Sequence, residues 1–215
     1  MSDSASNYFE LGLAAQIGKK FKTSKKYYQQ LLVMYPTHPD ATHNLGVLCL
    51  QIRVPRKSLR YFMKALVLDP KKSQFWISYI DVLIRLDKIS QASSALDLSK
   101  RSGVEASVLG KLSDRINNKL LEEEIKKLVF LYNRGLFEDI LKYKNKLSEK
   151  FEGNHIIQNI FGAANAGLGR YSRAVEYYKM AINKYPTYPD SYNNLANSFS
   201  RLNQVEMAYK SLRKA

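Results

Sequence analysis

Residues 42–70 read THNLGVLCLQIRVPRKSLRYFMKALVLDP, and the spacing within this stretch recurs every 34 residues along most of the chain. Here a large residue and a small one, Leu45 and Gly46, are followed by Phe62, Ala65 and Pro70. Three other stretches fill the same places with Leu11, Gly12, Tyr28, Leu31 and Pro36, with Phe161, Gly162, Tyr178, Ala181 and Pro186, and with Leu195, Ala196, Leu212 and Ala215. The chain is therefore predicted to consist of repeats.

Each repeat has the pattern of a helical hairpin. Apolar residues at a spacing of three and four, as in Leu45, Leu48 and Ile52, predict a helix with one buried stripe. Small residues at one fixed place on each helix let two backbones approach, and a proline such as Pro70 ends the second helix because it cannot extend it. A single hairpin cannot bury its own apolar face, so neighbouring hairpins must stack.

These residues resemble the tetratricopeptide repeat, whose signature is a helix-turn-helix unit of about 34 residues. The match is close in units 39–72 and 155–188. The resemblance implies an all-α solenoid of stacked antiparallel hairpins, with a right-handed superhelical sense.

We expect about six units in two arrays of three. The first array, within residues 1–106, has units 5–38, 39–72 and 73–106, and the second, within 121–215, has units 121–154, 155–188 and the incomplete 189–215. The last unit is seven residues short of full length, so the chain is predicted to be the N-terminal module of a larger protein.

The register slips by fourteen residues between the arrays, over residues 107–120. Apolar residues at helical spacing predict an added helix there. It either seals the first array or continues to Tyr132 as one long helix joining the arrays. The third unit has Ser102, Gly103 and Val104 in place of a proline, which predicts a glycine cap on its second helix.

The composition gives the sign of the net charge and an expectation for the cellular compartment. The chain has 34 Lys and Arg against 19 Asp and Glu, a net charge of +15, which favours an acidic partner in the long-range field. Basic residues gather in the turns and early second helices, and a solvated surface is the favoured interpretation: Lys19, Lys20, Lys22, Lys25, Lys26, Arg53, Arg56, Lys57 and Arg60. With no secretory signal and no apolar run of membrane-spanning length, a cytoplasmic protein is expected. The single cysteine, Cys49, excludes an internal disulfide and is predicted to pack in the core.

No catalytic group is predicted. The three histidines, His38, His43 and His155, share no ligand spacing with Cys, Asp or Glu, and no strand and glycine-rich phosphate loop are found. The acidic run at residues 122–124 is interpreted as a solvated helix N-terminus, where carboxylates favour the dipole, rather than as acid/base machinery. We therefore expect no enzyme activity, no cofactor and no metal.

Polar residues on the first helix of each unit are the candidate binding residues, because that helix lines the concave surface of such stacks. The candidates are His43, Asn44, Gln51, Ser78, Asp81, Arg85, Asn159, Asn193, Asn194, Asn197 and Arg201. Asparagine can hydrogen-bond both the donor and the acceptor of an extended peptide backbone. The alternative interpretation is that these asparagines are simply solvated.

Two family comparisons refine this hypothesis. Asn44 and Asn194 occupy equivalent places, and YNNLANS at residues 192–198 resembles the asparagine ladder of the tetratricopeptide superhelix in O-linked N-acetylglucosamine transferase. The ladder is incomplete, since Glu10, Ser78, Lys126 and Ile160 fill the matching place elsewhere. Chaperone-binding tetratricopeptide domains grip a C-terminal carboxylate with a lysine and an asparagine on the first unit, an asparagine on the second and two basic residues on the third. This chain has Phe9 and Leu13 at the first-unit places and Gln74 and Ser78 at the third-unit places, and only Asn44 fits. A clamp of that type is therefore not expected.

The leading hypothesis is a non-catalytic interaction scaffold that binds a peptide or partner domain. The first alternative is a substrate-recruiting module of a fused transferase, since residues 121–215 resemble bacterial tetratricopeptide segments that precede sulfotransferase or glycosyltransferase domains. The second is electrostatic binding of nucleic acid or of an anionic membrane. Nucleic acid is the less favoured of these partners, because Tyr27, Tyr28 and Tyr61 have a spacing that suits packing better. The sequence makes no prediction of oligomeric state.

Overall fold

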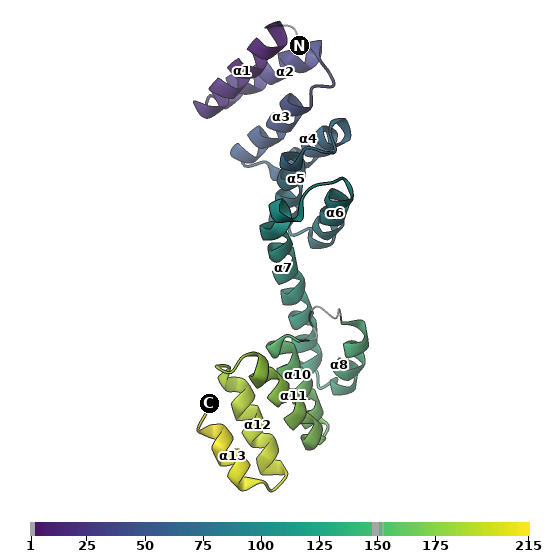
Figure 1. Ribbon diagram of the computed structural model, residues 1–215, viewed down its shortest axis with the longest axis vertical. Helices are drawn as coiled ribbons and strands as arrows, with labels where there is room; N and C mark the ends of the chain where they lie inside the picture. The colour runs from purple at the N-terminus through teal and green to yellow at the C-terminus, as the bar shows by residue number, and fades with distance from the viewer. Residues whose placement is uncertain (1–2, 148–150, 152) are drawn as a thin grey trace. The chain divides into compact units, whose positions relative to one another are not determined.

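The computed structural model describes residues 3–147, 151 and 153–215, and within them it contains helices and no β-strand (Figure 1). The first seven helices are α1 (Asp3–Ile17), α2 (Phe21–Met34), α3 (Pro39–Gln51), α4 (Pro55–Leu68), α5 (Ser73–Arg85), α6 (Ile89–Arg101) and α7 (Ala106–Asn133). They are followed by α8 (Phe137–Tyr143), the short 3-10 helix η1 (Lys144–Lys146), α10 (His155–Gly167), α11 (Tyr171–Lys184), α12 (Pro189–Arg201) and α13 (Val205–Leu212). The all-α hairpin architecture predicted from the repeats is confirmed.

The chain divides into two compact units, which we call the N-terminal unit (Met1–Lys119) and the C-terminal unit (Leu120–Ala215). The boundary falls within α7, so residues 107–120 are the N-terminal half of one continuous helix. The acidic run at residues 122–124 therefore lies in the interior of α7, and its interpretation as a helix N-terminus is wrong. Glu124 is instead held by Lys127 and by the hydroxyl of Tyr143.

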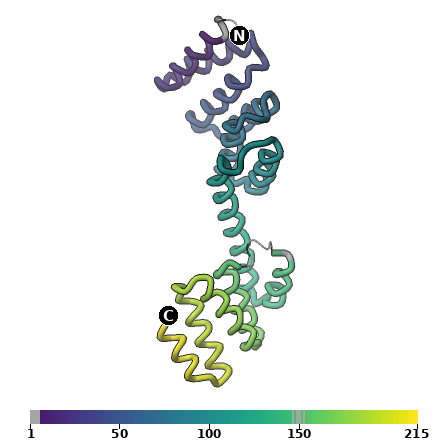
Figure 2. The backbone as a smooth tube through the Cα atoms, viewed as in Figure 1, coloured from purple at the N-terminus to yellow at the C-terminus, as the bar shows by residue number. Residues whose placement is uncertain are grey.

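Within each unit, consecutive helices pair as hairpins and each hairpin packs on the next (Figure 2). The glycine at one fixed place makes the pairing close. A Cβ atom added to Gly46 would lie 2.6 Å from the ring of Phe62, and one added to Gly162 would lie 2.5 Å from the ring of Tyr178. The large ring of the second helix thus lies directly on the backbone of the first.

The turn inside each hairpin has one residue with a positive φ, and these residues recur at the repeat interval within each unit. They are Lys19, Arg53 and Asp87 in the N-terminal unit and Gly135, Gly169 and Asn203 in the C-terminal unit. The left-handed conformation closes the turn so that the second helix returns along the first. A further glycine, Gly103, has φ 88° just after α6, which confirms the predicted glycine cap.

The core follows the repeat pattern. In the N-terminal unit, Trp76 is 7% exposed and its indole N–H donates to the Pro70 carbonyl at 2.8 Å. In the C-terminal unit, Leu128, Ile140 and Phe161 form one buried cluster between α7, α8 and α10. The first helices of the hairpins are thereby fixed, and their remaining faces are available for polar side chains.

Candidate functional site

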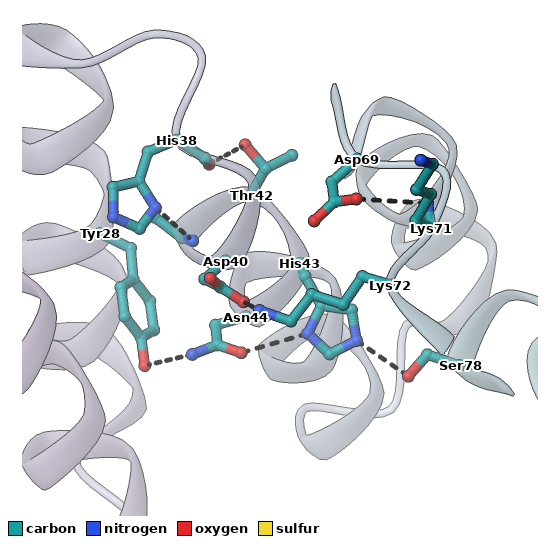
Figure 3. Close-up of polar contacts among 11 residues, drawn as sticks. Tyr28, His38, Asp40, Thr42, His43, Asn44, Asp69, Lys71, Lys72 and Ser78 are labelled. Carbon is teal, nitrogen blue, oxygen red and sulfur yellow. Dashed lines mark hydrogen bonds and ion pairs between the residues drawn. The ribbon is translucent and has the colours of Figure 1, made fainter. Parts of the chain in front are cut away.

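A chain of polar contacts crosses the N-terminal unit from α5 to α2 (Figure 3). The Nε2 atom of His43 lies 2.9 Å from the hydroxyl of Ser78, and the Nδ1 atom lies 3.2 Å from the Oδ1 atom of Asn44. The amide of Asn44 then donates to the hydroxyl of Tyr28 at 3.1 Å. Three candidates, from two neighbouring first helices, are thus connected to one another.

The same chain continues through α2 and α1 to the end of α3. The hydroxyl of Tyr28 donates to the Oε1 atom of Gln16 at 2.9 Å, and the Gln16 amide donates to the Oε1 atom of Gln51 at 3.0 Å. If Ser78 donates to a neutral His43 that carries its proton on Nδ1, every group in the chain donates in the same direction, toward Gln51.

His43 is a packing residue rather than an exposed contact. Its side chain is 6% exposed, and the ring lies 4.8 Å from that of Phe75 and 5.1 Å from that of Phe62, measured between ring centroids. Burial lowers the pKa of His43, and the hydrogen bond to Asn44 and the charge of Asp40 oppose that effect. The buried position of His43 therefore favours a packing role over the direct contact with a partner that the sequence predicted.

Asp81 and Arg85, the other candidates of this unit, form ion pairs. The carboxylate of Asp81 is bound by the Arg85 Nε atom and by the Arg115 Nη1 atom, each at 2.6 Å. Arg115 belongs to α7, so this pairing ties α5 to the helix that follows the third hairpin. The polar groups of the N-terminal unit thus largely satisfy one another.

In the C-terminal unit, a pocket of about 400 Å³ opens between α7, α10, α11 and α12. Four of its five candidates line this pocket: Asn159, Asn194, Asn197 and Arg201. Asn193 is exposed and lies outside the lining. The structure therefore brings together residues that the sequence could only place on the same side of two successive units.

Two of these asparagines bind each other. The Asn194 amide donates to the Oδ1 atom of Asn159 at 3.2 Å, and the Ser191 hydroxyl donates to the same atom at 3.1 Å. The side chains of Asn197 and Arg201 are exposed and make no hydrogen bond or ion pair with any residue that the structure describes. Their donors face solvent at the pocket.

The aromatic wall of the pocket was missed at the sequence level. Tyr132, Tyr171 and Tyr178 line it. Tyr178 is 2% exposed, its hydroxyl has no hydrogen-bond partner among the described residues, and burial raises its pKa well above the ordinary value. The signal that could have found the pocket is the pair of small residues Ala163 and Ala166, which stand where the first unit has Leu13 and Gln16.

Comparison with known proteins places the repeats in a family. Two family models described as tetratricopeptide repeat match residues 162–188 and 177–210, over the same hairpins that carry the pocket. Residues 162–210 therefore match the tetratricopeptide repeat, in agreement with the repeat pattern of the chain. The likeness to the O-linked N-acetylglucosamine transferase superhelix stays a prediction.

Solved tetratricopeptide structures have the same fold. The TPR2AB domain of yeast Sti1, solved as a complex with pHSP90, superposes with a TM-score of 0.57 at 13% identity, over 98% of this chain and 88% of that one. The TPR domain of P58(IPK) gives a TM-score of 0.53 at 10% identity, over 98% of this chain and 59% of that one.

A curated relative is the protein CTR9 homolog of Arabidopsis thaliana, which is 23% identical over 241 residues. The match covers 97% of this chain but only 22% of that relative, so the chain corresponds to about a fifth of the longer protein.

Two further observations concern other classes of site. Across residues 3–147, 151 and 153–215, no group of three or more His, Cys, Asp or Glu is placed to hold a metal ion. In the same residues, no helix combines the length and the apolar character that crossing a membrane requires.

Proposed function

We propose that this chain is a non-catalytic peptide-binding scaffold, and that the pocket of the C-terminal unit receives an extended, acidic segment of a partner protein. The observation that carries the proposal is the set of unengaged groups at the pocket. Asn197, Arg201 and the hydroxyl of Tyr178 have no partner among the described residues, and no Asp or Glu lines the pocket.

The chemistry of these groups matches that ligand. An asparagine side chain can donate to a peptide carbonyl and accept from a peptide N–H, which fixes the backbone without reading the sequence. The guanidinium of Arg201 can bind a carboxylate through two parallel hydrogen bonds. A volume of about 400 Å³ is within the ordinary range for binding pockets and suits one or two side chains with their backbone.

The two units contribute differently in this proposal. In the N-terminal unit, His43, Asn44, Ser78 and Asp81 bind one another or neighbouring residues, so they hold the hairpins in register. Gln51 and Arg85 are exposed, and each already has one partner. The net charge of +15 assists the approach of an acidic segment, whereas the pocket determines how it is held.

The Sti1 domain, whose fold resembles this one, was solved as a complex with pHSP90, which supports a peptide-binding role for such stacks. The mode here is expected to differ. At places used by a carboxylate clamp this chain has Phe9, whose ring stacks on that of His38 and is tilted against that of Tyr28, and Ser78, which is bound to His43. We therefore assign recognition to the C-terminal pocket.

A peptide-display selection tests the proposal. Random twelve-residue peptides are selected on the wild-type chain and depleted on Ala166→Gln, a variant that places in the pocket the residue found at the equivalent place of the first unit. We expect the surviving peptides to be enriched in Asp and Glu. If no peptide distinguishes the two proteins, the pocket is not a peptide site.

Affinities of a selected peptide then identify the contacts. Asn197→Ala and Arg201→Ala should each weaken binding by about 1 kcal/mol or more, because each removes a hydrogen bond. Asn193→Ala is the matched control, since Asn193 is an exposed asparagine of the same helix outside the pocket, and it should leave the affinity unchanged. Equal effects of all three substitutions would contradict the assignment.

The alternatives drawn from the sequence have their own outcomes. An electrostatic binder of nucleic acid or anionic membrane would bind with strong dependence on salt and would be indifferent to Ala166→Gln. Recruitment of a substrate to a fused transferase would use the same pocket, and only the sequence of the parent protein distinguishes it.

A further inference from the structure

A second pocket lies in the N-terminal unit, between the start of α2, the end of α3 and the start of α4, which are neighbours in Figure 1. Its volume is about 450 Å³. The walls are apolar and include Phe21, Leu48, Ile52 and Tyr61, and Ile52 is 51% exposed. Polar groups of the hydrogen-bond chain described above do not line it.

The charge around this pocket has one sign. Lys22, Lys25 and Lys57 line it, all three are exposed, and none forms an ion pair with a described carboxylate. No Asp or Glu is among the lining residues. The half-buried thiol of Cys49 lies in the same pocket, where burial raises its pKa and the charges of Lys25 and Lys57 oppose that effect. At least two of the three ammonium groups are therefore close enough to Cys49 to affect its thiol.

The residue at the place of Cys49 is larger in other hairpins. The residue 150 positions after Cys49 is Phe199, which is 4% exposed and packs in the core with Val175 and Ala208. Within the N-terminal unit, the residue 34 positions after Cys49 is Leu83, which is 1% exposed. Cys49 is smaller than either residue and lines its pocket, whereas Phe199 lies in the core and does not line the pocket at the counterpart place.

The three lysines do not recur at the equivalent places of the C-terminal unit. The residues 150 positions after Lys22, Lys25 and Lys57 are Ser172, Val175 and Met207, none of which is charged. A pocket is also present at the counterpart place, lined by Tyr171, Ser172 and Leu202, the equivalents of Phe21, Lys22 and Ile52. The three lysines around Cys49 therefore distinguish the pocket of this hairpin from that of its counterpart.

We propose that this pocket is a second binding site, which takes a large apolar side chain of a partner peptide whose neighbouring residues are acidic. The apolar side chain fills the space next to Cys49, and the acidic residues meet Lys22, Lys25 and Lys57 at the rim. Burying an apolar side chain against Leu48 and Ile52 supplies affinity, and the unpaired cations supply selectivity for acidic flanks. A phosphodiester backbone offers charge without the apolar anchor that the walls require. This site does not depend on the C-terminal pocket.

Defined peptides and the single cysteine provide the test. The probe is a blocked, fluorescein-labelled peptide with the sequence Glu-Asp-Phe-Leu-Asp-Glu, compared with Glu-Asp-Ala-Ala-Asp-Glu and with Gln-Asn-Phe-Leu-Asn-Gln. Binding is measured by fluorescence anisotropy. Occupancy of the pocket is measured independently with the unlabelled peptides, from the rate at which neutral iodoacetamide alkylates Cys49, the only cysteine of the chain. We expect the first peptide to bind and to slow alkylation at least fivefold, and each control peptide to bind at least tenfold more weakly.

Variants then separate the cavity from the charge. Cys49→Phe and Cys49→Leu fill the space with residues found at equivalent places and should abolish binding. Two such variants are used, each checked by circular dichroism, so that misfolding of one does not decide the result. Lys25→Met with Lys57→Met should weaken binding at least tenfold, and Ala166→Gln should have no effect.

Three outcomes would overturn the proposal. The first is the absence of binding by the Phe-Leu acidic peptide. The second is binding that is equally strong in Cys49→Phe. The third is protection of Cys49 by laurate, by anionic phospholipid vesicles or by single-stranded DNA with no protection by the peptide, which would assign the pocket to a lipid or a nucleic acid. Because Ala166→Gln is neutral here, failure of this site is distinguishable from failure of the C-terminal pocket.

Discussion

The two units place the same residues at the same repeat positions and use them differently. Tyr28 and Tyr178 are equivalent, 150 residues apart, as are Asn44 and Asn194. In the N-terminal unit the tyrosine hydroxyl accepts from Asn44 and donates to Gln16. In the C-terminal unit the Tyr178 hydroxyl has no described partner, and Asn194 donates to Asn159 instead.

The difference arises from two positions at which the C-terminal unit has alanine. Gln16 and Leu13 have the counterparts Ala166 and Ala163. Shortening these two side chains removes the partner of the tyrosine and opens the pocket beside it. A repeat can therefore change from a satisfied interface to one with an open pocket while its signature residues stay unchanged.

The largest expected effect concerns the packing of α5 in the N-terminal unit. Trp76→Ala should lower its free energy of unfolding by about 3–5 kcal/mol, because the side chain is 7% exposed and its indole N–H binds the Pro70 carbonyl. Urea denaturation followed by circular dichroism measures the effect, and Trp76→Phe should cost clearly less. A loss below about 1 kcal/mol would show that this unit is not tightly packed at α5.

The next effect tests the origin of the pocket directly. Gln16→Ala should cost about 1–3 kcal/mol, because Gln16 is buried and its loss leaves the Tyr28 hydroxyl without its acceptor. The reverse substitution, Ala166→Gln, should cost little or stabilise, since the new amide can accept from Tyr178. A crystal structure of each variant should show a pocket next to Tyr28 in the first and no pocket next to Tyr178 in the second. Equal destabilisation by both changes would mean that the two places are not equivalent.

A smaller effect is expected at the turns, where the units use different residues for the same conformation. Gly169 has φ 72°, so Gly169→Ala should cost about 1 kcal/mol. Arg53 has φ 60°, a conformation that a side chain with a Cβ atom disfavours. Arg53→Gly removes this cost but raises the entropy of the unfolded chain, so the free energy of unfolding should stay the same or rise by up to about 1 kcal/mol. Thermal unfolding of the two variants decides the matter. Destabilisation by Arg53→Gly comparable to that by Gly169→Ala would show that the arginine side chain holds its turn.

The hairpins were predictable because they depend on contacts that repeat. One contact explains the glycine of three hairpins: an aromatic ring of the second helix covers Gly12, Gly46 and Gly162. Because the same contact recurs in each hairpin, the residues that make it recur at a fixed interval in the sequence. The cap at Gly103 was predictable for a similar reason, as a glycine can adopt the left-handed conformation that ends a helix.

The candidate site was less predictable because it depends on what lies across from each residue. His43 and Asn193 occupy equivalent places, yet His43 is buried against Phe75 of the next hairpin while Asn193 is exposed in the last complete first helix. Likewise, Asn44 and Asn194 were expected to act alike, but the Asn44 amide donates to Tyr28 of α2 while the Asn194 amide donates to Asn159 of α10. A pattern along one helix cannot show such contacts.

The last prediction is a difference in response to acid. Burial lowers the pKa of His38 and His43 in the N-terminal unit, and of the half-buried His155 in the C-terminal unit. A histidine whose pKa is lower in the folded state binds fewer protons there than in the unfolded chain. Its contribution to stability is therefore complete above the unfolded pKa of about 6.5 and is lost as the pH falls below that value.

The N-terminal unit, with two such histidines, should consequently lose more stability between pH 7.5 and pH 5.5 than the C-terminal unit. Urea midpoints followed by Trp76 fluorescence report the N-terminal unit, because Trp76 is the only tryptophan of the chain. His43→Asn introduces the residue found at the equivalent place, Asn193, and should reduce the loss on acidification whatever its effect at pH 7.5. An unchanged loss in His43→Asn would mean that His43 can be protonated within the fold, with Ser78 turning to accept its Nε2–H and the hydrogen-bond chain reversing at that point.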